Sequence, residues 1–219
     1  EVSRIVSYAV AKGRGKFAAL VPSTPYGQRV EEAFRNSVMQ SGREMVMVQN
    51  YQPNPQALDP AVKAIAKSGF DAIFLPEGGT MLRSLGPILT INGVDPRKIQ
   101  LLGTGLWDDP AVAKETSLMG GWYAVPPQDQ RSNFITRYQQ LYGSKPPRIA
   151  SLAYDAVALS ATLADGTPGK RYTRVAIADP NGFAGIDGIF RFRSDGMTER
   201  GLAVMEVSNG GQLNVISPA

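Results

Sequence analysis

The stretch LVPSTPYGQRVEEAF, at residues 20–34, decides how the rest of the chain is interpreted. It begins in an apolar run typical of a buried strand and ends with the spacing of an amphipathic helix. α/β proteins usually hold small ligands at such turns, at the carboxyl ends of their strands. The turn has no glycine-rich phosphate motif and no P-loop lysine. Its hydroxyls, aromatic ring and single glycine therefore suit a small polar molecule better than a nucleotide.

The composition is that of an ordinary globular protein, and it narrows the chemistry. A chain of 219 residues with 43% hydrophobic side chains fits one large or two small domains with a sound core. The net charge of +4 is spread without a basic run, which argues against nucleic acid as a partner. The absence of Cys and His removes disulfides, thiolate nucleophiles, histidine bases and most zinc sites. We therefore expect no catalytic residue, no metal site and no cofactor.

Strand-like and helix-like segments alternate through the first two thirds of the chain. The expected strands are 16–22, 44–51, 70–76, 99–105 and 120–126. The expected helices are 2–12, 26–41, 58–69, 78–93, 108–115 and 132–142. Because the strands are continuously apolar and alternate with helices, they predict a parallel, Rossmann- or flavodoxin-like α/β sheet with helices on both faces.

The last third of the chain has a different pattern. Residues 148–164 are apolar on nearly all sides of a helix, so we expect that helix to be heavily buried. Residues 185–216 alternate apolar and polar side chains and contain Asp-Gly and Asn-Gly pairs. This combination is typical of antiparallel hairpins, so the α/β sheet is expected to be followed by a C-terminal β-hairpin.

Five segments occur in the order found in a known family. They are ALVPSTPYGQRVEEAFRNSVMQSG, FDAIFLPEGGTMLRSL, LLGTGLWDDP, FITRYQQLYGSKPPRIASLAYDAVAL and GIDGIFRFRSDGMTERGLAVMEVSNGG. With them the chain resembles type I periplasmic solute-binding proteins, the leucine/isoleucine/valine-binding and branched-chain amino-acid receptors of ABC transporters. It also resembles penicillin-binding protein activators, which share that fold. The resemblance extends over nearly the whole sequence.

The resemblance implies two lobes that clamp a ligand. It assigns lobe 2 to residues 14–126 and 184–219, and a helical remnant of lobe 1 with the hinge crossovers to residues 1–13 and 127–183. The opening strand and helix of lobe 1 have no counterpart, so we expect a fragment of a longer receptor; the alternative is a natural short paralogue. The uncovered lobe 1 face of helix 148–164 would invite self-association.

The resemblance also places residues near the ligand, beginning with the opening stretch. Tyr26 matches an aromatic residue that lies against the ligand from lobe 2, where its ring can stack and its hydroxyl can donate a hydrogen bond. Ser23 and Thr24 are candidates beside it, and the helix start offers unpaired N–H groups to an α-carboxylate. The alternative is that Tyr26 only packs at the turn while Ser23 or Thr24 caps the helix.

A second group of candidates follows the third expected strand. Gly78 and Gly79 would let the backbone approach a ligand closely, and the Glu77 carboxylate can receive an ammonium group. Branched-chain receptors carry tyrosines where this chain has glycines, which argues for a different specificity. The alternative is a solvated loop with a helix cap.

The loop GTGLWDD after the fourth expected strand supplies the remaining candidates. Family members pair an acidic residue of this loop with the ligand ammonium; Asp108 can serve, although the strict match is a glycine. Trp107 is expected as a cleft wall or, alternatively, as half-buried packing. Asp109 precedes a proline and is expected to cap a helix. Tyr154 and Asp155 are expected to be structural, bridging a lobe 1 helix to the hinge.

These observations predict a periplasmic receptor that binds an amino acid or similar small polar solute and is read by the membrane permease of an ABC transporter. The second candidate is a penicillin-binding protein activator-like lipoprotein that regulates peptidoglycan synthesis through protein contacts. An enzyme is the third, and the sequence offers it no nucleophile–base pair, metal cluster or cofactor loop. The expected location is the periplasm, and a lipid anchor on the full-length protein is compatible with either leading candidate.

Overall fold

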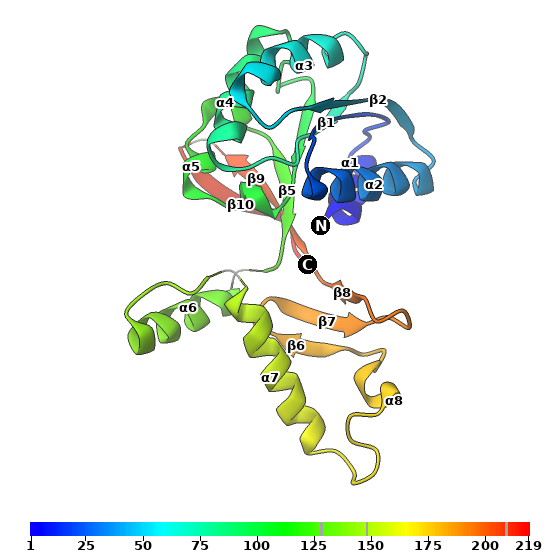
Figure 1. Cartoon of the computed structure of the whole chain (residues 1–219), viewed down its shortest axis with the longest axis vertical. Helices are drawn as coiled ribbons and strands as arrows, with labels where there is room; N and C mark the ends of the chain where they lie inside the picture. The colour runs from blue at the N-terminus through cyan, green and yellow to red at the C-terminus, as the bar shows by residue number, and fades with distance from the viewer. Residues whose placement is uncertain (128, 148, 209) are drawn as a thin grey trace. The chain divides into compact units, whose positions relative to one another are not determined.

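The computed structural model of the chain divides into two compact units (Figure 1). Unit 1 comprises Glu1–Val125 and Val204–Pro218, and unit 2 comprises Pro126–Ala203 together with Ala219. The structure describes residues 1–127, 129–147, 149–208 and 210–219. Within those residues, no helix has both the length and the apolar character needed to cross a bilayer.

Unit 1 is built on a seven-stranded sheet with the order β10-β9-β5-β4-β3-β1-β2. Its strands are β1 (Lys16–Pro22), β2 (Glu44–Tyr51), β3 (Ala72–Phe74), β4 (Gln100–Gly103), β5 (Trp122–Val125), β9 (Ala203–Ser208) and β10 (Gln212–Ser217). The pairs among β1 to β5 are parallel, and β9 and β10 pair antiparallel. Both the predicted parallel sheet and the predicted C-terminal hairpin are confirmed.

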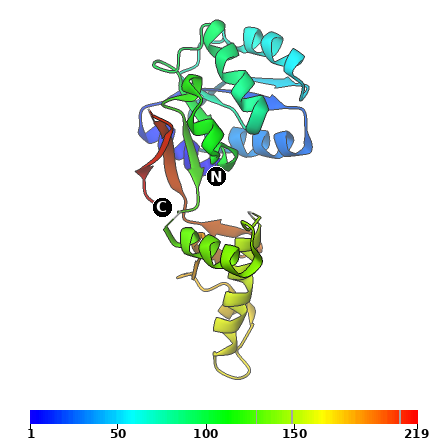
Figure 2. The same ribbon diagram turned by 90° about the vertical axis from the view of Figure 1, so that its left-hand side faces the viewer.

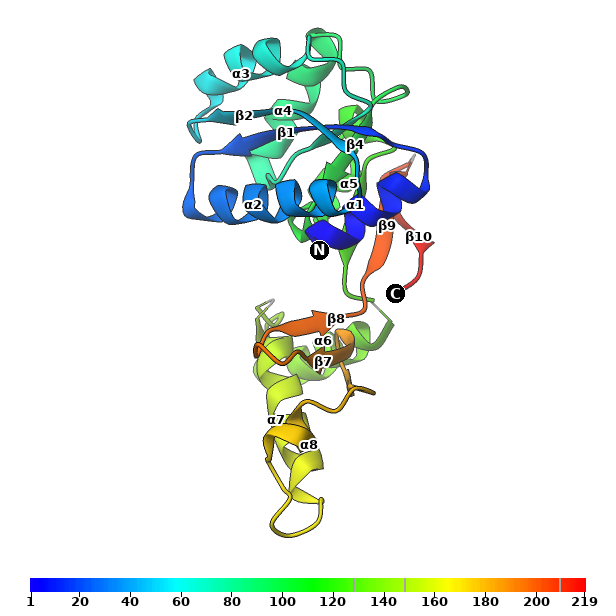
Figure 3. The same ribbon diagram turned by 90° about the vertical axis from the view of Figure 1, so that its right-hand side faces the viewer.

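Helices cover both faces of this sheet, with α1 and α2 on one face and α3 and α4 on the other (Figure 3). The helices are α1 (Val2–Ala11), α2 (Pro25–Gln40), α3 (Leu58–Ile65), α4 (Gly79–Ile91) and α5 (Pro110–Ala113), with 3-10 turns η1 (Pro55–Ala57), η2 (Gly105–Trp107) and η3 (Thr116–Leu118). Under α2, the rings of Phe34 and Phe74 stack with centroids 4.5 Å apart, and Phe17 meets Phe34 edge-on. All three are fully buried and form part of the core.

The turn between β1 and α2 is unusually tight, because the helix begins almost directly on the end of the strand. Thr24 is the N-cap, and its hydroxyl oxygen accepts a hydrogen bond from the Gly27 N–H at 3.0 Å. A Cβ atom on Gly27 would lie 1.9 Å from the Pro22 carbonyl oxygen. Glycine is therefore required here by the close approach of two backbone segments.

Replacing this glycine should destabilise unit 1. We expect Gly27→Ala to lower the free energy of unfolding by about 2–3 kcal/mol, because the new methyl group meets backbone atoms that cannot move aside. Urea unfolding followed by tryptophan fluorescence measures this directly, since both tryptophans, Trp107 and Trp122, lie in unit 1.

Gly15→Ala is the matched control for that substitution. Its φ is not in the left-handed region, and its new Cβ would meet only an Asp71 oxygen at 3.9 Å. We expect a change within about 1 kcal/mol. Equal stability losses in the two variants would show that the close approach at Gly27 is not what the turn requires.

Unit 2 is smaller and pairs three helices with a separate antiparallel sheet of order β6-β7-β8. Its elements are α6 (Asp129–Tyr142), α7 (Ala150–Ala164), α8 (Arg174–Ile177), β6 (Phe183–Gly185), β7 (Gly188–Phe192) and β8 (Thr198–Arg200). Figure 2 shows the green α6 lying across the N-terminal end of the yellow-green α7.

Asp155 ties α7 to the sheet of unit 2. One of its carboxylate oxygens accepts the Ile186 N–H at 2.7 Å, and the other lies 3.3 Å from the Arg200 guanidinium. The side chain is buried, so these partners compensate for the loss of its hydration. The prediction that Asp155 is structural agrees with these contacts.

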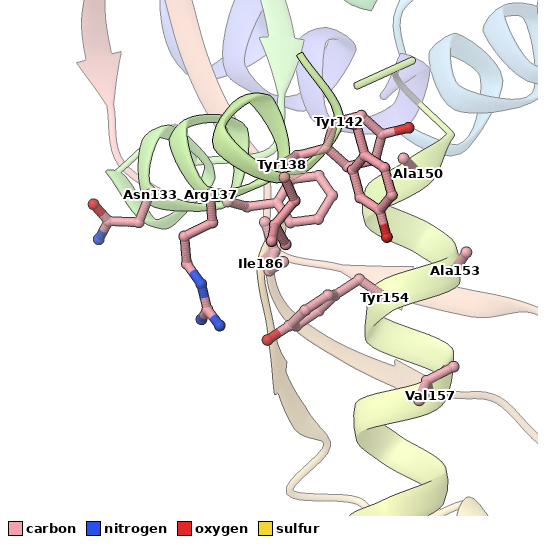
Figure 4. Close-up of a pocket in the computed structure, with 11 residues that line it drawn as sticks. Asn133, Arg137, Tyr138, Tyr142, Ala150, Ala153, Tyr154, Val157 and Ile186 are labelled. Atoms are coloured by element: carbon pink, nitrogen blue, oxygen red, sulfur yellow. The ribbon is translucent and has the colours of Figure 1, made fainter. Parts of the chain in front are cut away.

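The structure corrects the expected burial of helix 148–164. In α7 only Ser151 and Asp155 are buried, while Leu152, Tyr154 and Val157 are exposed. An apolar pattern on all sides predicts a helix surrounded by protein. In unit 2 the helix has only the small sheet and α6 against parts of its surface, so the remaining apolar side chains stay exposed, Tyr154 and Val157 among them (Figure 4).

The two units also divide the chain differently from the predicted lobes. Helix α1 belongs to unit 1 because it packs on α2 and β5. Strands β6 to β8 belong to unit 2 because they form a sheet of their own. The assignment of either unit to a lobe of a longer receptor stays a prediction.

Candidate functional site

The carboxyl ends of β1, β3 and β4 bring several of the predicted residues to one edge of unit 1. Tyr26 lies in the first turn of α2, and its hydroxyl forms a 3.0 Å hydrogen bond with the hydroxyl of Thr104, just after β4. The Tyr26 residue remains 41% exposed, so its ring is accessible beside this bond. Burial raises the pKa of Tyr26, and the charges of Glu1 and Glu77 add to that effect while the Thr104 bond opposes it.

Ser23 and Thr24 do different things at the turn. Thr24 caps α2 through Gly27, so the capping alternative holds for this residue. Ser23 is exposed, and its backbone N–H donates to the Tyr51 carbonyl at 2.8 Å. Because Pro25 has no N–H and the Gly27 N–H is already bonded, the helix start has fewer free donors for a carboxylate than the sequence suggested.

Glu77 is held by a residue that the sequence analysis did not single out. The Tyr51 hydroxyl, at the end of β2, donates a 2.7 Å hydrogen bond to the Glu77 carboxylate. Tyr51 is buried and Glu77 is half-buried. Burial raises the pKa of the Glu77 carboxyl above its ordinary value, while the bonds from Tyr51 and the Gly78 backbone act in the opposite direction.

Gly78 and Gly79 begin α4 beside this carboxylate. Gly78 is the N-cap, and a Cβ there would approach the Leu106 Cβ to 3.0 Å, so the backbone passes close to the neighbouring loop. Gly79 has φ of +55° and nothing within 4 Å of where a Cβ would lie. Gly79 is exposed, so the space where its side chain would lie is open to a ligand.

Trp107, which was expected as a cleft wall or as half-buried packing, lies in the core of unit 1. Its side chain is fully buried, and its indole N–H donates to the Leu75 carbonyl at 3.2 Å. Gly103 and Gly121 make room for the ring, because a Cβ on either would lie within 2.5 Å of an indole atom. In this arrangement the ring belongs to the core and is not at the surface for a solute to contact.

Asp108 is partly exposed and lies near β5. Its charge adds to burial in raising the pKa of Tyr123, a fully buried residue whose hydroxyl has no hydrogen-bond partner among the described residues. Asp109, by contrast, caps α5 by accepting the Ala111 N–H at 2.8 Å, as predicted.

The edge is acidic. The three strand-end segments, residues 22–27, 75–79 and 103–109, contain Glu77, Asp108 and Asp109 and no Lys or Arg. No group of three acidic side chains suited to a metal ion occurs in the part of the chain that the structure describes. The half-buried Glu77 carboxylate, with fixed hydroxyls nearby, suits a compact organic cation better than an anion.

Tyr51 and Thr104 are the residues that the sequence analysis missed. Both stand at carboxyl ends of strands, Tyr51 as the last residue of β2 and Thr104 directly after β4. Strand position alone was the available signal. Their partners, Glu77 and Tyr26, are 26 and 78 residues away in sequence, so the pairing itself had no local sign.

Removing the Tyr51 hydroxyl should change the titration of Glu77. In Tyr51→Phe the ionised carboxylate loses a donor, so we expect the Glu77 pKa to rise above its value in the unaltered protein. Carbon-detected NMR titration of the Glu77 carboxyl measures the shift without any ligand. Tyr142→Phe, on an exposed ring of unit 2, is the control and should leave the titration unchanged. An unchanged Glu77 pKa in Tyr51→Phe would mean that the bond does not hold the carboxylate.

A parallel α/β sheet with polar side chains gathered at its strand ends defines a small-molecule-binding architecture. The family profile described as periplasmic binding protein matches residues 1–212, and the chain belongs to that family. A search of curated protein sequences finds no significant match.

Solved structures of the same fold include the following three. One, from Rhodospirillum rubrum and described as a branched-chain amino acid ABC transporter, has a TM-score of 0.84 and 22% identity over 98% of this chain and 64% of its own. A Desulfitobacterium hafniense ABC transporter substrate-binding protein in complex with Leu has a TM-score of 0.67 and 18% identity over 98% of this chain and 64% of its own. An R. palustris solute-binding protein in complex with 4-hydroxybenzoate has a TM-score of 0.72 and 20% identity over 100% of this chain and 64% of its own. The chain spans less than two thirds of each.

Proposed function

We propose that unit 1 supplies one wall of a solute site and that its acidic edge receives the ammonium group of an amino-acid-like solute. The observation that carries this proposal is the half-buried Glu77 carboxylate, fixed by the buried Tyr51 hydroxyl at 2.7 Å. A carboxylate whose orientation is fixed before binding loses little entropy when it pairs with a cation. Tyr26, exposed beside it, offers a ring for the aliphatic part of the solute.

The charge of the edge favours amino acids over aromatic acids, the two ligand classes seen in the solved structures. A benzoate presents an anion and no cation, and it would meet Glu77 and Asp108 with no Lys or Arg in the strand-end segments. The capped start of α2 adds few donors for that anion. An amino acid can place its ammonium at this edge and leave its carboxylate to groups outside it.

We base the rest of the proposed activity on membership of the periplasmic binding protein family. We propose that the longer protein acts in the periplasm as the receptor of an ABC transporter, that its closed form is read by a membrane permease, and that a lipid anchor is compatible with this role. Because the chain spans less than two thirds of the solved structures compared with it, we expect it to bind its solute near 1 mM, where a two-lobed receptor would bind near 1 μM.

A thermal-shift screen of amino acids, benzoate and 4-hydroxybenzoate tests the choice of solute. At a ligand concentration about tenfold above the dissociation constant, we expect stabilisation of about 1.4 kcal/mol, or a few degrees, for at least one amino acid. Neither benzoate should give a shift. Glu77→Gln should weaken the amino-acid response at least tenfold, because the pairing charge is lost while the shape is kept.

Glu44→Gln is the control for Glu77→Gln. Glu44 is an exposed carboxylate at the start of β2, at the opposite edge of the same sheet, so its loss changes the net charge equally without touching the site. A benzoate response that survives Glu77→Gln would contradict the proposed solute class. If no compound of the panel shifts the melting temperature, the result would instead favour the second candidate, a penicillin-binding protein activator-like regulator of peptidoglycan synthesis. Protein partners would then be sought in place of solutes.

A further inference from the structure

Thr104, directly after β4, carries a buried hydroxyl whose hydrogen bonds determine what the neighbouring Tyr26 can do. Thr104 is only 1% exposed, so its side chain is screened from water. Among the described residues its hydroxyl has two partners, the Leu106 N–H at 3.4 Å and the Tyr26 hydroxyl at 3.0 Å. An N–H group can only donate, so the Thr104 oxygen is the acceptor in the bond with Leu106.

The hydrogen of the Thr104 hydroxyl has one acceptor among these partners, which is the Tyr26 oxygen. If Tyr26 donated to Thr104 instead, the Thr104 hydrogen would be buried without an acceptor, which costs free energy. Tyr26 has no such difficulty, because it is partly exposed and its own hydrogen can bond to water. The bond is therefore expected to run from the Thr104 O–H to the Tyr26 oxygen.

This direction of the bond also fixes the hydrogen of Tyr26. Because a phenol oxygen is conjugated with its ring, the O–H bond lies near the ring plane and has two favoured positions, one on each side of the C–O axis. Thr104 donates from one of these sides, so the Tyr26 O–H points to the other. Tyr26 thus offers a hydrogen-bond donor of defined direction, which a freely rotating hydroxyl would not.

The bond between Tyr26 and Thr104 extends past the carboxyl end of β3. Tyr26 follows β1 and Thr104 follows β4, and β3 lies between these two strands in the sheet. Glu77 comes three residues after Phe74, the last residue of β3. The Glu77 charge contributes to raising the pKa of Tyr26, which agrees with this proximity. A donor on Tyr26 and a carboxylate acceptor on Glu77 therefore lie at the same strand ends.

We propose that Thr104 is a positioning residue of the solute site, because its buried hydroxyl donates to the Tyr26 oxygen and so directs the Tyr26 O–H toward an oxygen atom of the solute. This inference rests on the proposed function, since Tyr26 contacts a solute only if unit 1 supplies a wall of the site. It adds a requirement to that function: the solute offers a hydrogen-bond acceptor to Tyr26 as well as an ammonium group to Glu77. Thr104 acts through Tyr26, because it is buried itself.

Hydroxyl hydrogen exchange, followed by NMR without any ligand, tests the direction of the bond. In an equal mixture of H2O and D2O, the 13C signal of a carbon that bears a hydroxyl splits in two when that hydroxyl exchanges slowly. We expect a split signal from the Thr104 Cβ, whose hydroxyl is buried and bonded, and a single averaged signal from the Tyr26 Cζ. Thr104→Val and Tyr26→Phe identify the two signals. A split Tyr26 signal or an averaged Thr104 signal overturns the proposal.

A double-mutant cycle tests whether Thr104 acts on binding through Tyr26. The dissociation constant of the amino acid that gives the largest thermal shift is measured by NMR titration, and circular dichroism verifies that each variant is folded. We expect Thr104→Val to weaken binding about fivefold, the effect of one hydrogen bond. Thr104→Ser keeps the hydroxyl and should stay within about twofold of the unaltered chain.

The second arm of the cycle repeats Thr104→Val in a Tyr26→Phe background. We expect no further loss of affinity there, because the hydroxyl that Thr104 positions is already absent. An equal loss in both backgrounds would mean that Thr104 only supports the loop, and it overturns the proposal. If no amino acid binds, the proposed function fails, and the hydroxyl exchange measurement still decides whether Thr104 directs the Tyr26 hydroxyl.

Discussion

The close contact between α2 and the end of β1 is the constraint on which the site of unit 1 depends. With no side chain at Gly27, the helix starts against the Pro22 carbonyl, and Thr24 closes the turn. That placement sets the Tyr26 ring at the sheet edge, where its hydroxyl meets Thr104 from β4. A looser turn would leave the same residues in sequence but would separate the hydroxyl pair.

A second element of the core fixes the other side of this edge. The indole of Trp107 lies among Gly103 and Gly121 and donates to the Leu75 carbonyl, which connects the loop after β4 to the end of β3. Glu77 follows Leu75 by two residues, so the buried ring helps to determine where that carboxylate stands. Trp107, which was expected as a cleft wall, thus supports the candidate site as a buried core residue.

Local patterns carried most of the fold, since apolar strands, helix periodicity and Asp-Gly turns each act within about ten residues. The same patterns located Tyr26, Glu77 and Asp108 at strand ends. They could not reveal that Trp107 is buried, because the space for it comes in part from Gly121, before β5. They also could not reveal that Tyr51 reaches Glu77 past the intervening strand β1. For α7 the apolar pattern is present, but the rest of unit 2 covers only part of the helix, so Leu152, Tyr154 and Val157 stay exposed.

The balance of forces at Glu77 supports the class of solute that we propose. Partial removal from water raises the pKa of this carboxyl and so costs free energy in the ionised form, which the Tyr51 hydroxyl offsets in part. In the site that we propose, the same low-dielectric surroundings would strengthen an ion pair with the ammonium group of the solute, which would complete the compensation. The proposed site needs the ionised carboxylate, which is lost as pH falls through the Glu77 pKa, so we expect its affinity for an ammonium-bearing solute to fall on acidification. A neutral or anionic solute would leave the half-buried charge of Glu77 uncompensated, so the site that we propose would discriminate between solutes by their charge.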